Sequence, residues 1–189
     1  MEKIRLATWI DAPVERCFLL SLSIDLHAAA AGRKELDAVL DGLVGEGETI
    51  TFQRAFFGLQ QHTSRIEALR PYSYFRDVMV SGPFKYFEHV HHFAAMDDGT
   101  RVRDEIRFSA PWGPLGRILA RRRLAAFLNE RSAVIKRVAE SNEWRQYLES
   151  DMEDGPPGAS IKTDPEAGWE KNSILRSSQE IVVPRPPHA

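Results

Sequence analysis

The stretch RILARRRLAAFLNERSAVIKRVAESNEWRQYL, residues 117–148, decides how the rest of the chain is organised. No Pro or Gly interrupts it, and its Ala, Leu, Arg and Glu residues are good helix formers. Apolar residues recur at spacings of three and four, which places them on one helix face: Leu124, Phe127, Leu128, Val134, Ile135 and Val138. The sequence therefore predicts a long helix that covers an apolar surface.

Arg131 projects near the middle of this apolar stripe, given about 100° of rotation per helical residue. A guanidinium in such a place is unfavourable unless a carboxylate or another polar group meets it. Two interpretations stay open. Either Arg131 is paired with an acid across the contact, or its long side chain reaches the solvent at the edge of the stripe.

The composition is that of a folded globular chain. A length of 189 residues allows one domain with a substantial core, and 43% apolar with 28% charged residues excludes a disordered or membrane-spanning protein. The net charge of -2 gives no general attraction to nucleic acid, so we expect no nucleic-acid partner. The N-terminus lacks the pattern of a signal peptide, which favours a cytoplasmic protein.

The first forty residues predict two strands and two helices. Lys3–Ile10 alternates and is rich in strand formers, and Asp11 is a suitable cap for a helix that follows it. Cys17 lies in that helix and, as the single cysteine, excludes an internal disulfide and a multi-cysteine zinc site, so we expect it to be buried in the core. Ser23–His27 predicts a short second helix, and Leu36–Leu40 predicts a brief strand.

Five strand-forming segments follow at nearly even spacing, separated by short turn sequences. They are Glu48–Phe57, Leu59–Leu69, Tyr74–Ser81, Phe84–Ala95 and Val102–Ser109. Asp98-Gly99, between the last two, is the strongest hairpin signal in the chain. Because such short connections join neighbouring antiparallel strands, the sequence predicts an antiparallel meander.

The composition changes after residue 150. Residues 151–189 contain Pro and Gly at high frequency and few core residues, which predicts a domain over 1–150 and a disordered tail over 151–189. Within the tail, Ile181, Val182 and Val183 form an apolar run that could dock as a small strand.

Several motifs resemble those of one known superfamily. They are FFG (56–58), HTSRIEALRP (62–71), FRDVMVSGPF (75–84), FEHVHHF (87–93), RDEIRFSAPWGPLG (103–116) and the Arg131 of LNERSAVIK. Together with the element order, they resemble the SRPBCC, or START-like, superfamily, which is related to birch pollen allergen and polyketide cyclases. Within it, they are similar to a bacterial branch of ligand-binding SRPBCC proteins, over about residues 3–148.

The resemblance implies an α+β helix-grip fold. In that fold a curved antiparallel sheet wraps around a long C-terminal helix, with two short helices after the first strand and an apolar cavity between sheet and helix. It implies no particular reaction, because the superfamily contains carriers, sensors and enzymes.

Strand alternation predicts which side chains face that cavity. The expected inward residues are Phe75, Asp77 and Met79, then Phe87, His89, His91 and Phe93, then Val102, Asp104, Ile106 and Phe108. Arg101, Arg103, Glu105 and Arg107 would then face the solvent. His27 and His92 are expected to face elsewhere, and His62 is left unassigned.

Turn lengths predict how these residues face one another. A two-residue Asp98-Gly99 turn would pair Phe93 with Asp104 and set His91 diagonal to that acid. A three-residue loop over 82–84 would set Asp77 opposite His89, and a longer one would set it opposite His91. Either way, two carboxylates and two imidazoles share one wall below the long helix.

Three interpretations of this polar group remain open. It can be a satisfied structural network, the polar end of a ligand pocket, or a catalytic or zinc site in which His89 or His91 is the base and Asp77 or Asp104 orients it. The expected ligand-binding residues are Phe75, Asp77, Met79, Phe87, His89, His91, Phe93, Asp104, Ile106, Phe108, Phe127 and Arg131.

The sequence thus favours a protein that binds a small hydrophobic molecule, such as a lipid, isoprenoid or polyketide-like compound, with no cofactor and no metal. A cyclase or dehydratase in the same cavity, and an interaction module with a filled core, are the alternatives. A basic and apolar segment, Trp112–Arg123, allows a weak contact with an anionic membrane surface, although a solvated basic face is the simpler interpretation. The sequence makes no prediction of the oligomeric state.

Overall fold

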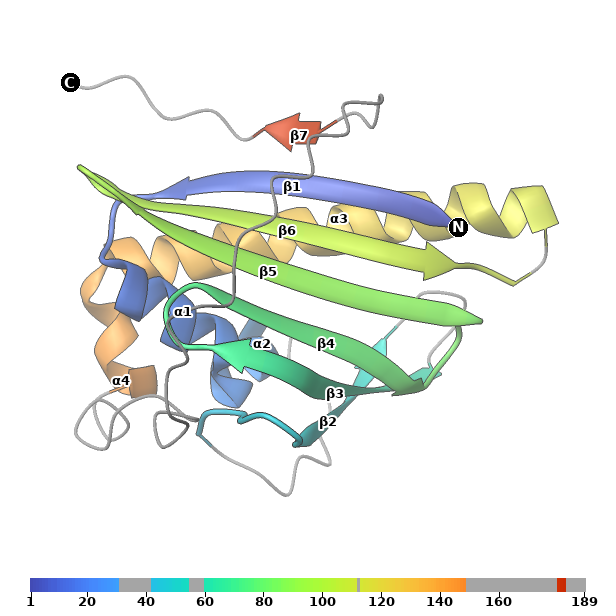
Figure 1. The fold of residues 1–189 in the computed structure, drawn as a ribbon, viewed down its shortest axis with the longest axis horizontal. Coiled ribbons are helices and arrows are strands. Elements are labelled where there is room, and N and C mark those ends of the chain that lie inside the picture. The colour runs from blue at the N-terminus through green and yellow to red at the C-terminus, as the bar shows by residue number, and fades with distance from the viewer. Residues whose placement is uncertain (31–41, 55–59, 112, 149–179, 183–189) are drawn as a thin grey trace, which may run out of the picture.

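The strands form one seven-stranded sheet with the helices on one of its faces (Figure 1). The computed structural model describes residues 1–30, 42–54, 60–111, 113–148 and 180–182. The strands are β1 (Glu2–Ile10), β2 (Thr49–Arg54), β3 (Gln60–Arg70), β4 (Tyr74–Ser81), β5 (Tyr86–Met96), β6 (Gly99–Ser109) and β7 (Glu180–Val182). The helices are α1 (Val14–Leu22), α2 (Ile24–Ala30), α3 (Gly113–Glu140), the 3-10 helix η1 (Asn142–Trp144) and α4 (Arg145–Leu148).

The sheet order β2-β3-β4-β5-β6-β1-β7 confirms the predicted meander and the α+β helix-grip fold. Every pair from β2 to β1 is antiparallel, while β7 adds to the outer edge of β1 in parallel orientation. The prediction that the segment around Ile181 docks as a strand is confirmed for 180–182. The predicted strand Leu36–Leu40 and the rest of the tail lie outside the described residues, and the described residues include no helix long and apolar enough to cross a membrane.

The long helix α3 begins and ends earlier than predicted. It starts at Gly113 because Pro114 fits the first helical turn, where a backbone N–H has no partner within the helix. It ends at Glu140 because Ser141 is extended and its side chain accepts a hydrogen bond from the Glu143 backbone N–H. The predicted continuous helix over 117–148 is therefore wrong beyond Glu140, where η1 and α4 turn away.

The prediction that Asp11 caps α1 is also wrong. The cap position of α1 is occupied by Pro13, which makes no side-chain hydrogen bond there. The backbone N–H of Asp11 donates instead to Glu140 Oε1 over 2.8 Å, which ties the end of β1 to the end of α3. Cys17 is fully buried in α1, as predicted, and burial raises its pKa to about 11.

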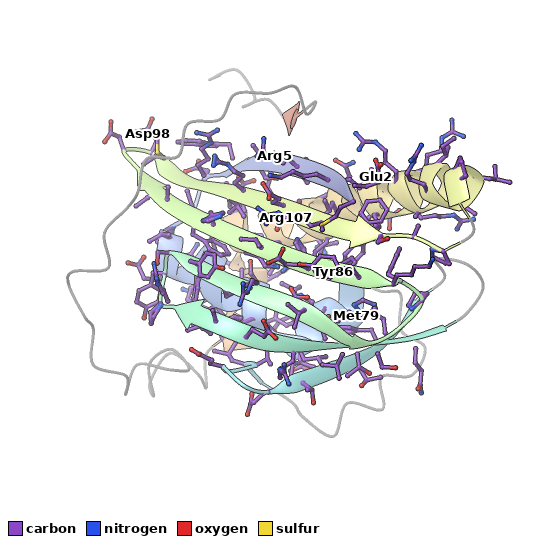
Figure 2. All side chains as sticks on the ribbon, turned by 45° about the vertical axis from the view of Figure 1, so that its right-hand side comes forward. Glu2, Arg5, Met79, Tyr86, Asp98 and Arg107 are labelled. Atoms are coloured by element: carbon purple, nitrogen blue, oxygen red, sulfur yellow. The ribbon has the colours of Figure 1, made fainter. Side chains whose placement is uncertain are left out.

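The β5–β6 hairpin has a different register from the predicted one. Met96 pairs with Gly99, so the two turn residues are Asp97 and Asp98, at the tip that Figure 2 labels. Gly99 has φ +149°, and a Cβ there would lie 2.4 Å from the Ile10 carbonyl oxygen. The glycine is therefore required for close packing against the end of β1 rather than inside the turn. The two-residue shift keeps every side chain on its predicted face and sets His91 directly opposite Asp104.

The predicted faces of the strands are confirmed. Phe75, Phe87, His89, His91, Phe93, Val102, Asp104, Ile106 and Phe108 are buried on the inner side. The β4–β5 ladder sets Asp77 opposite His89, which is the register expected of the shorter loop. On the outer face, Figure 2 shows Arg5 and Arg107, and both bind Glu105.

The core divides into two clusters along α3. Leu124 and Leu128 pack with Ile106 and Phe108 against the β1–β6 side of the sheet. Ile135 and Val138 belong to a larger cluster that includes α1, α2 and the inner face of β2 to β4. Within the predicted stripe, Phe127 and Val134 are only partly buried, which leaves Phe127 at the border of the space between helix and sheet.

Candidate ligand-binding site

A cavity of about 60 Å³ lies between the sheet and the helices. Its lining residues are Ser21, His27, Val44, Ile50, Phe52, His62, Ser64, Ile66, Phe75, Asp77, Phe87, His89, His91, Phe127 and Arg131. This volume admits a few water molecules or one small chemical group, and it is well below the roughly 300–1,000 Å³ of pockets that enclose a drug-sized ligand. A ligand of lipid size therefore requires lining side chains to move.

Seven of the twelve predicted site residues line the cavity: Phe75, Asp77, Phe87, His89, His91, Phe127 and Arg131. The other five do not: Met79, Phe93, Asp104, Ile106 and Phe108. The physical reason is that Leu124 and Leu128 of α3 press directly on β6, so Ile106 and Phe108 belong to a filled core. Phe93 is similarly covered by Phe18 of α1, at a ring-centroid distance of 5.3 Å. The space is confined to the β2–β5 half of the sheet.

The two histidines of β5 are held between two carboxylates. On the cavity side, Asp77 Oδ1 lies 3.4 Å from His91 Nε2 and 3.8 Å from His89 Nδ1. On the far side, Asp104 Oδ1 lies 2.6 Å from His91 Nδ1 and 3.3 Å from His89 Nε2. Each imidazole thus has one nitrogen directed toward each acid.

Arg131 is buried, with 5% of its surface exposed, and it meets an acid rather than the solvent. Its Nη1 lies 3.5 Å from Asp104 Oδ1, which confirms the first of the two sequence interpretations. Its Nε donates to His27 Nε2 over 3.2 Å and its Nη2 donates to the Ser21 carbonyl over 3.1 Å. A buried guanidinium with three partners from three different elements holds α1, α2 and β6 together.

The expectation that His27 faces elsewhere is wrong, while the same expectation for His92 is met. His27 lies in α2, its Nε2 accepts from Arg131, and its Nδ1 is 2.8 Å from the Ser23 carbonyl, so it is a neutral ring with the proton on Nδ1. Spacing on one short helix could not reveal a contact that depends on how α2 and α3 cross. His92 is only partly buried and lies beside Tyr74 on the outer side of the sheet.

Sequence reasoning also missed the lining residues of β2 and β3. His62, Ser64 and Ile66 alternate along β3 and are all buried, so the period-two pattern was present in the sequence. Ile50 and Phe52 continue this wall on β2, and His62 Nε2 is 3.0 Å from Ser64 Oγ. Extending the alternation argument one strand further would have found this polar pair.

The pKa values of the site follow from burial and from the paired charges. Burial lowers the pKa of His89 to about 4, helped by the neighbouring His91, so the ring is neutral at pH 7. Burial alone would raise the pKa of Asp77, but its hydrogen bond with His91 and the nearby His89 lower it to about 2. Asp104 is likewise held well below the usual pKa of an aspartate, because the two histidines outweigh the effect of burial. Both acids are therefore carboxylates at neutral pH.

Comparison with solved structures shows the same fold in several proteins. The crystal structure of Ara h 8.0201 matches with a TM-score of 0.60 and 12% identity, over 73% of this chain and 97% of that one. A START superfamily protein from Mycobacterium smegmatis matches with a TM-score of 0.57 and 7% identity, over 73% and 97%. The di-domain ARO/CYC StfQ from the steffimycin biosynthetic pathway matches with a TM-score of 0.58 and 11% identity, over 75% of this chain and 52% of that one.

No protein-family model matches the sequence, and no curated protein matches it either. The likeness is therefore one of structure, and it agrees with the motifs, the sheet order and the long helix already described. The chain has the helix-grip fold that these structures share.

Proposed function

We propose that this protein binds a small hydrophobic molecule between α3 and the β2–β5 half of the sheet. The observation that carries the proposal is the composition of the cavity wall, which combines aromatic and aliphatic side chains with a group of buried polar ones. Phe52, Phe75, Phe87 and Phe127 supply the apolar part, and Asp77 with the two histidines of β5 supplies the polar end. Pockets for small ligands combine an apolar body with a few polar groups that fix orientation in this way.

The ligand class follows from the same wall. Asp77 accepts hydrogen bonds, and imidazole nitrogens accept or donate them, so an oxygen-bearing group on an otherwise apolar skeleton suits the site. Lipids, isoprenoids and polyketide-like compounds share this chemistry. The limited volume favours a compact ligand, or one whose apolar end displaces Phe127, which lies partly exposed at the border of the cavity.

Substituting Phe127 by arginine tests the proposal, because it places a charge in the apolar wall. We expect Phe127→Arg to abolish the saturable binding of an environment-sensitive dye and of a fatty acid, measured by fluorescence titration, while the circular dichroism of the folded protein is retained. Ala126→Arg is a matched control, since it adds the same charge at the neighbouring exposed position and should leave binding intact. Binding that survives Phe127→Arg unchanged would place the ligand elsewhere.

A second candidate function is acid–base catalysis on the bound molecule. It is favoured by the placement of His89 and His91 on the cavity wall between Asp77 and Asp104, because histidines paired with carboxylates suit the transfer of protons to and from a ligand. Native mass spectrometry of the protein from its own host separates the two functions. A copurified ligand that is recovered unchanged after incubation supports a carrier, and its conversion supports a cyclase or dehydratase.

The proposal includes a weak contact of the α3 start with anionic membranes. Leu115, Ile118 and Leu119 are exposed by 78%, 55% and 41%, beside Arg122 and Arg123 on the same helix. Such a pairing of apolar and basic side chains binds at the surface of a membrane. We expect sedimentation with phosphatidylserine vesicles that is lost in Ile118→Glu, while Ala126→Glu behaves as the native chain does. Equal sedimentation of the two variants would exclude this contact.

A further inference from the structure

We infer that Asp77, His89 and His91 bind a divalent transition-metal ion at the polar end of the cavity. Two imidazole nitrogens and one carboxylate oxygen, one from each residue, lie within 4.8 Å of one another. Two neutral histidines and one carboxylate are the donor set of catalytic zinc sites and of non-haem iron sites. The inference deepens the proposed binding function and departs from the expectation, made from the sequence, that the protein has no metal.

The strand register brings the three donors together. His89 and His91 are two residues apart on β5, so both point to the inner face, and Asp77 lies directly opposite His89 on β4. Asp77 Oδ1 is 3.4 Å from His91 Nε2 and 3.8 Å from His89 Nδ1. Two donors at the usual zinc bond lengths around a tetrahedral ion are about 3.3–3.4 Å apart. The three donor atoms, which lie within 4.8 Å of one another, would therefore draw closer together when an ion binds.

Asp104 prepares the histidines for this role from behind. His91 Nδ1 lies 2.6 Å and His89 Nε2 lies 3.3 Å from Asp104 Oδ1, so a proton on either nitrogen is attracted to this carboxylate. When an ion replaces the hydrogen bond between His91 and Asp77, protons held toward Asp104 would leave His91 Nε2 and His89 Nδ1 available to coordinate it. A carboxylate behind each histidine is the usual outer shell of a metal site.

The local charge also favours a cation. Arg131 compensates Asp104 at 3.5 Å, and His27 is neutral because it accepts from Arg131. The carboxylate of Asp77 is then left as a net negative charge on the cavity side, where it has a hydrogen bond of 3.4 Å with His91. The three donors line the cavity, so a water molecule or the oxygen of a bound ligand can take a fourth position. The metal would thus hold the oxygen-bearing end of the proposed ligand.

Titration of the full chain with Zn²⁺ after treatment with a chelator tests the inference, without any organic ligand. We expect isothermal titration calorimetry to show one equivalent of Zn²⁺, and Co²⁺ to give the visible absorption of a tetrahedral or five-coordinate site. Asp77→Asn and His91→Gln should weaken binding by at least tenfold. Asp104→Asn should weaken it by about 10–100-fold, the usual effect of removing an outer-shell partner.

His92→Gln is the matched control, because His92 lies next to His91 on the same strand but faces outward, and it should bind Zn²⁺ as the native chain does. If His91→Gln does not fold, Asp77→Asn decides the outcome, since it preserves the shape of a partly exposed side chain. Absence of Zn²⁺ binding, or binding that Asp77→Asn leaves unchanged, would overturn the inference. Dye binding by the metal-free chain is measured in parallel, so loss of the metal site and loss of the proposed binding function are distinguished.

Discussion

At the scale of single residues, Arg131 shows what one sequence can and cannot reveal. Its place within an apolar stripe left two interpretations open, pairing with an acid or reaching the solvent, and the structure shows that it pairs with Asp104. The two further partners, His27 and the Ser21 carbonyl, could not be predicted, because they come from helices whose crossing with α3 is set by packing. The spacing of apolar residues along the helix places Arg131 on the packed face, whereas the identity of its partners depends on tertiary contacts.

Removing Arg131 should be costly because it leaves the buried carboxylate of Asp104 without its cation. We expect Arg131→Met to lower the free energy of unfolding by about 3–5 kcal/mol, as for other broken buried pairs. Combining it with Asp104→Asn should recover part of that loss. Urea unfolding of the four proteins in this double-mutant cycle measures the coupling, and a value below about 0.5 kcal/mol would show that the pair is energetically independent.

Glu105, on the outer face, should make stability depend on pH. Burial raises its pKa, but hydrogen bonds from Lys3, Arg5 and Arg107 outweigh burial and lower the pKa from 4.5 to about 2. Because the folded value lies below the unfolded one, the stabilisation is present above pH 4.5 and is lost as the pH falls toward 2. The partners are partly exposed, which limits the effect to about 1 kcal/mol.

The comparison of urea unfolding at pH 7 and pH 3 measures this effect. Glu105→Gln should lose less stability on acidification than the native chain, by roughly that 1 kcal/mol. Glu130→Gln, which changes an exposed glutamate on α3, is the control and should follow the native chain. An equal acid response of Glu105→Gln and the native protein would show that the ion-pair network contributes nothing.

At the scale of elements, sequence periodicity predicted the faces of the strands better than it predicted where the elements begin and end. Alternation gave the correct faces of β6, where the inner side chains are buried and the arginines of the outer face are exposed. It also gave the correct inner residues of β5, although Glu88 and Val90 on the outer face of that strand are buried too.

The turn between β5 and β6 was misplaced because Gly99 serves packing against Ile10, which no local pattern records. The end of α3 was also predicted wrongly. The sequence beyond Glu140 could continue as a helix, but the Ser141 side chain accepts a hydrogen bond from the Glu143 backbone N–H and the helix ends there.

At the scale of the whole molecule, the candidate site was only partly predictable. The polar residues of β4 and β5 were found because charged and imidazole groups on an inner face stand out in the sequence. The extent of the cavity could not be predicted, because it depends on which strands α3 contacts. Leu124 and Leu128 close the space over β6, and this makes Ile106 and Phe108 core residues rather than lining residues.

Helix α3 packs directly against the β1–β6 side of the sheet but is separated from the other side by the cavity. The backbone hydrogen bonds of the two sides should therefore differ in how readily they open. Local opening free energies depend on the packing that each unit must break. We expect amide hydrogen exchange in β2, β3 and β4 to occur through a partial opening, with weaker protection than in β1 and β6. Leu128→Ala, on the β1–β6 side, should lower the protection of β6 by about 2–5 kcal/mol. Uniform protection across the sheet would contradict this division. The expected difference in protection would mean that a ligand can enter through β2–β4 while β1 and β6 keep the fold intact.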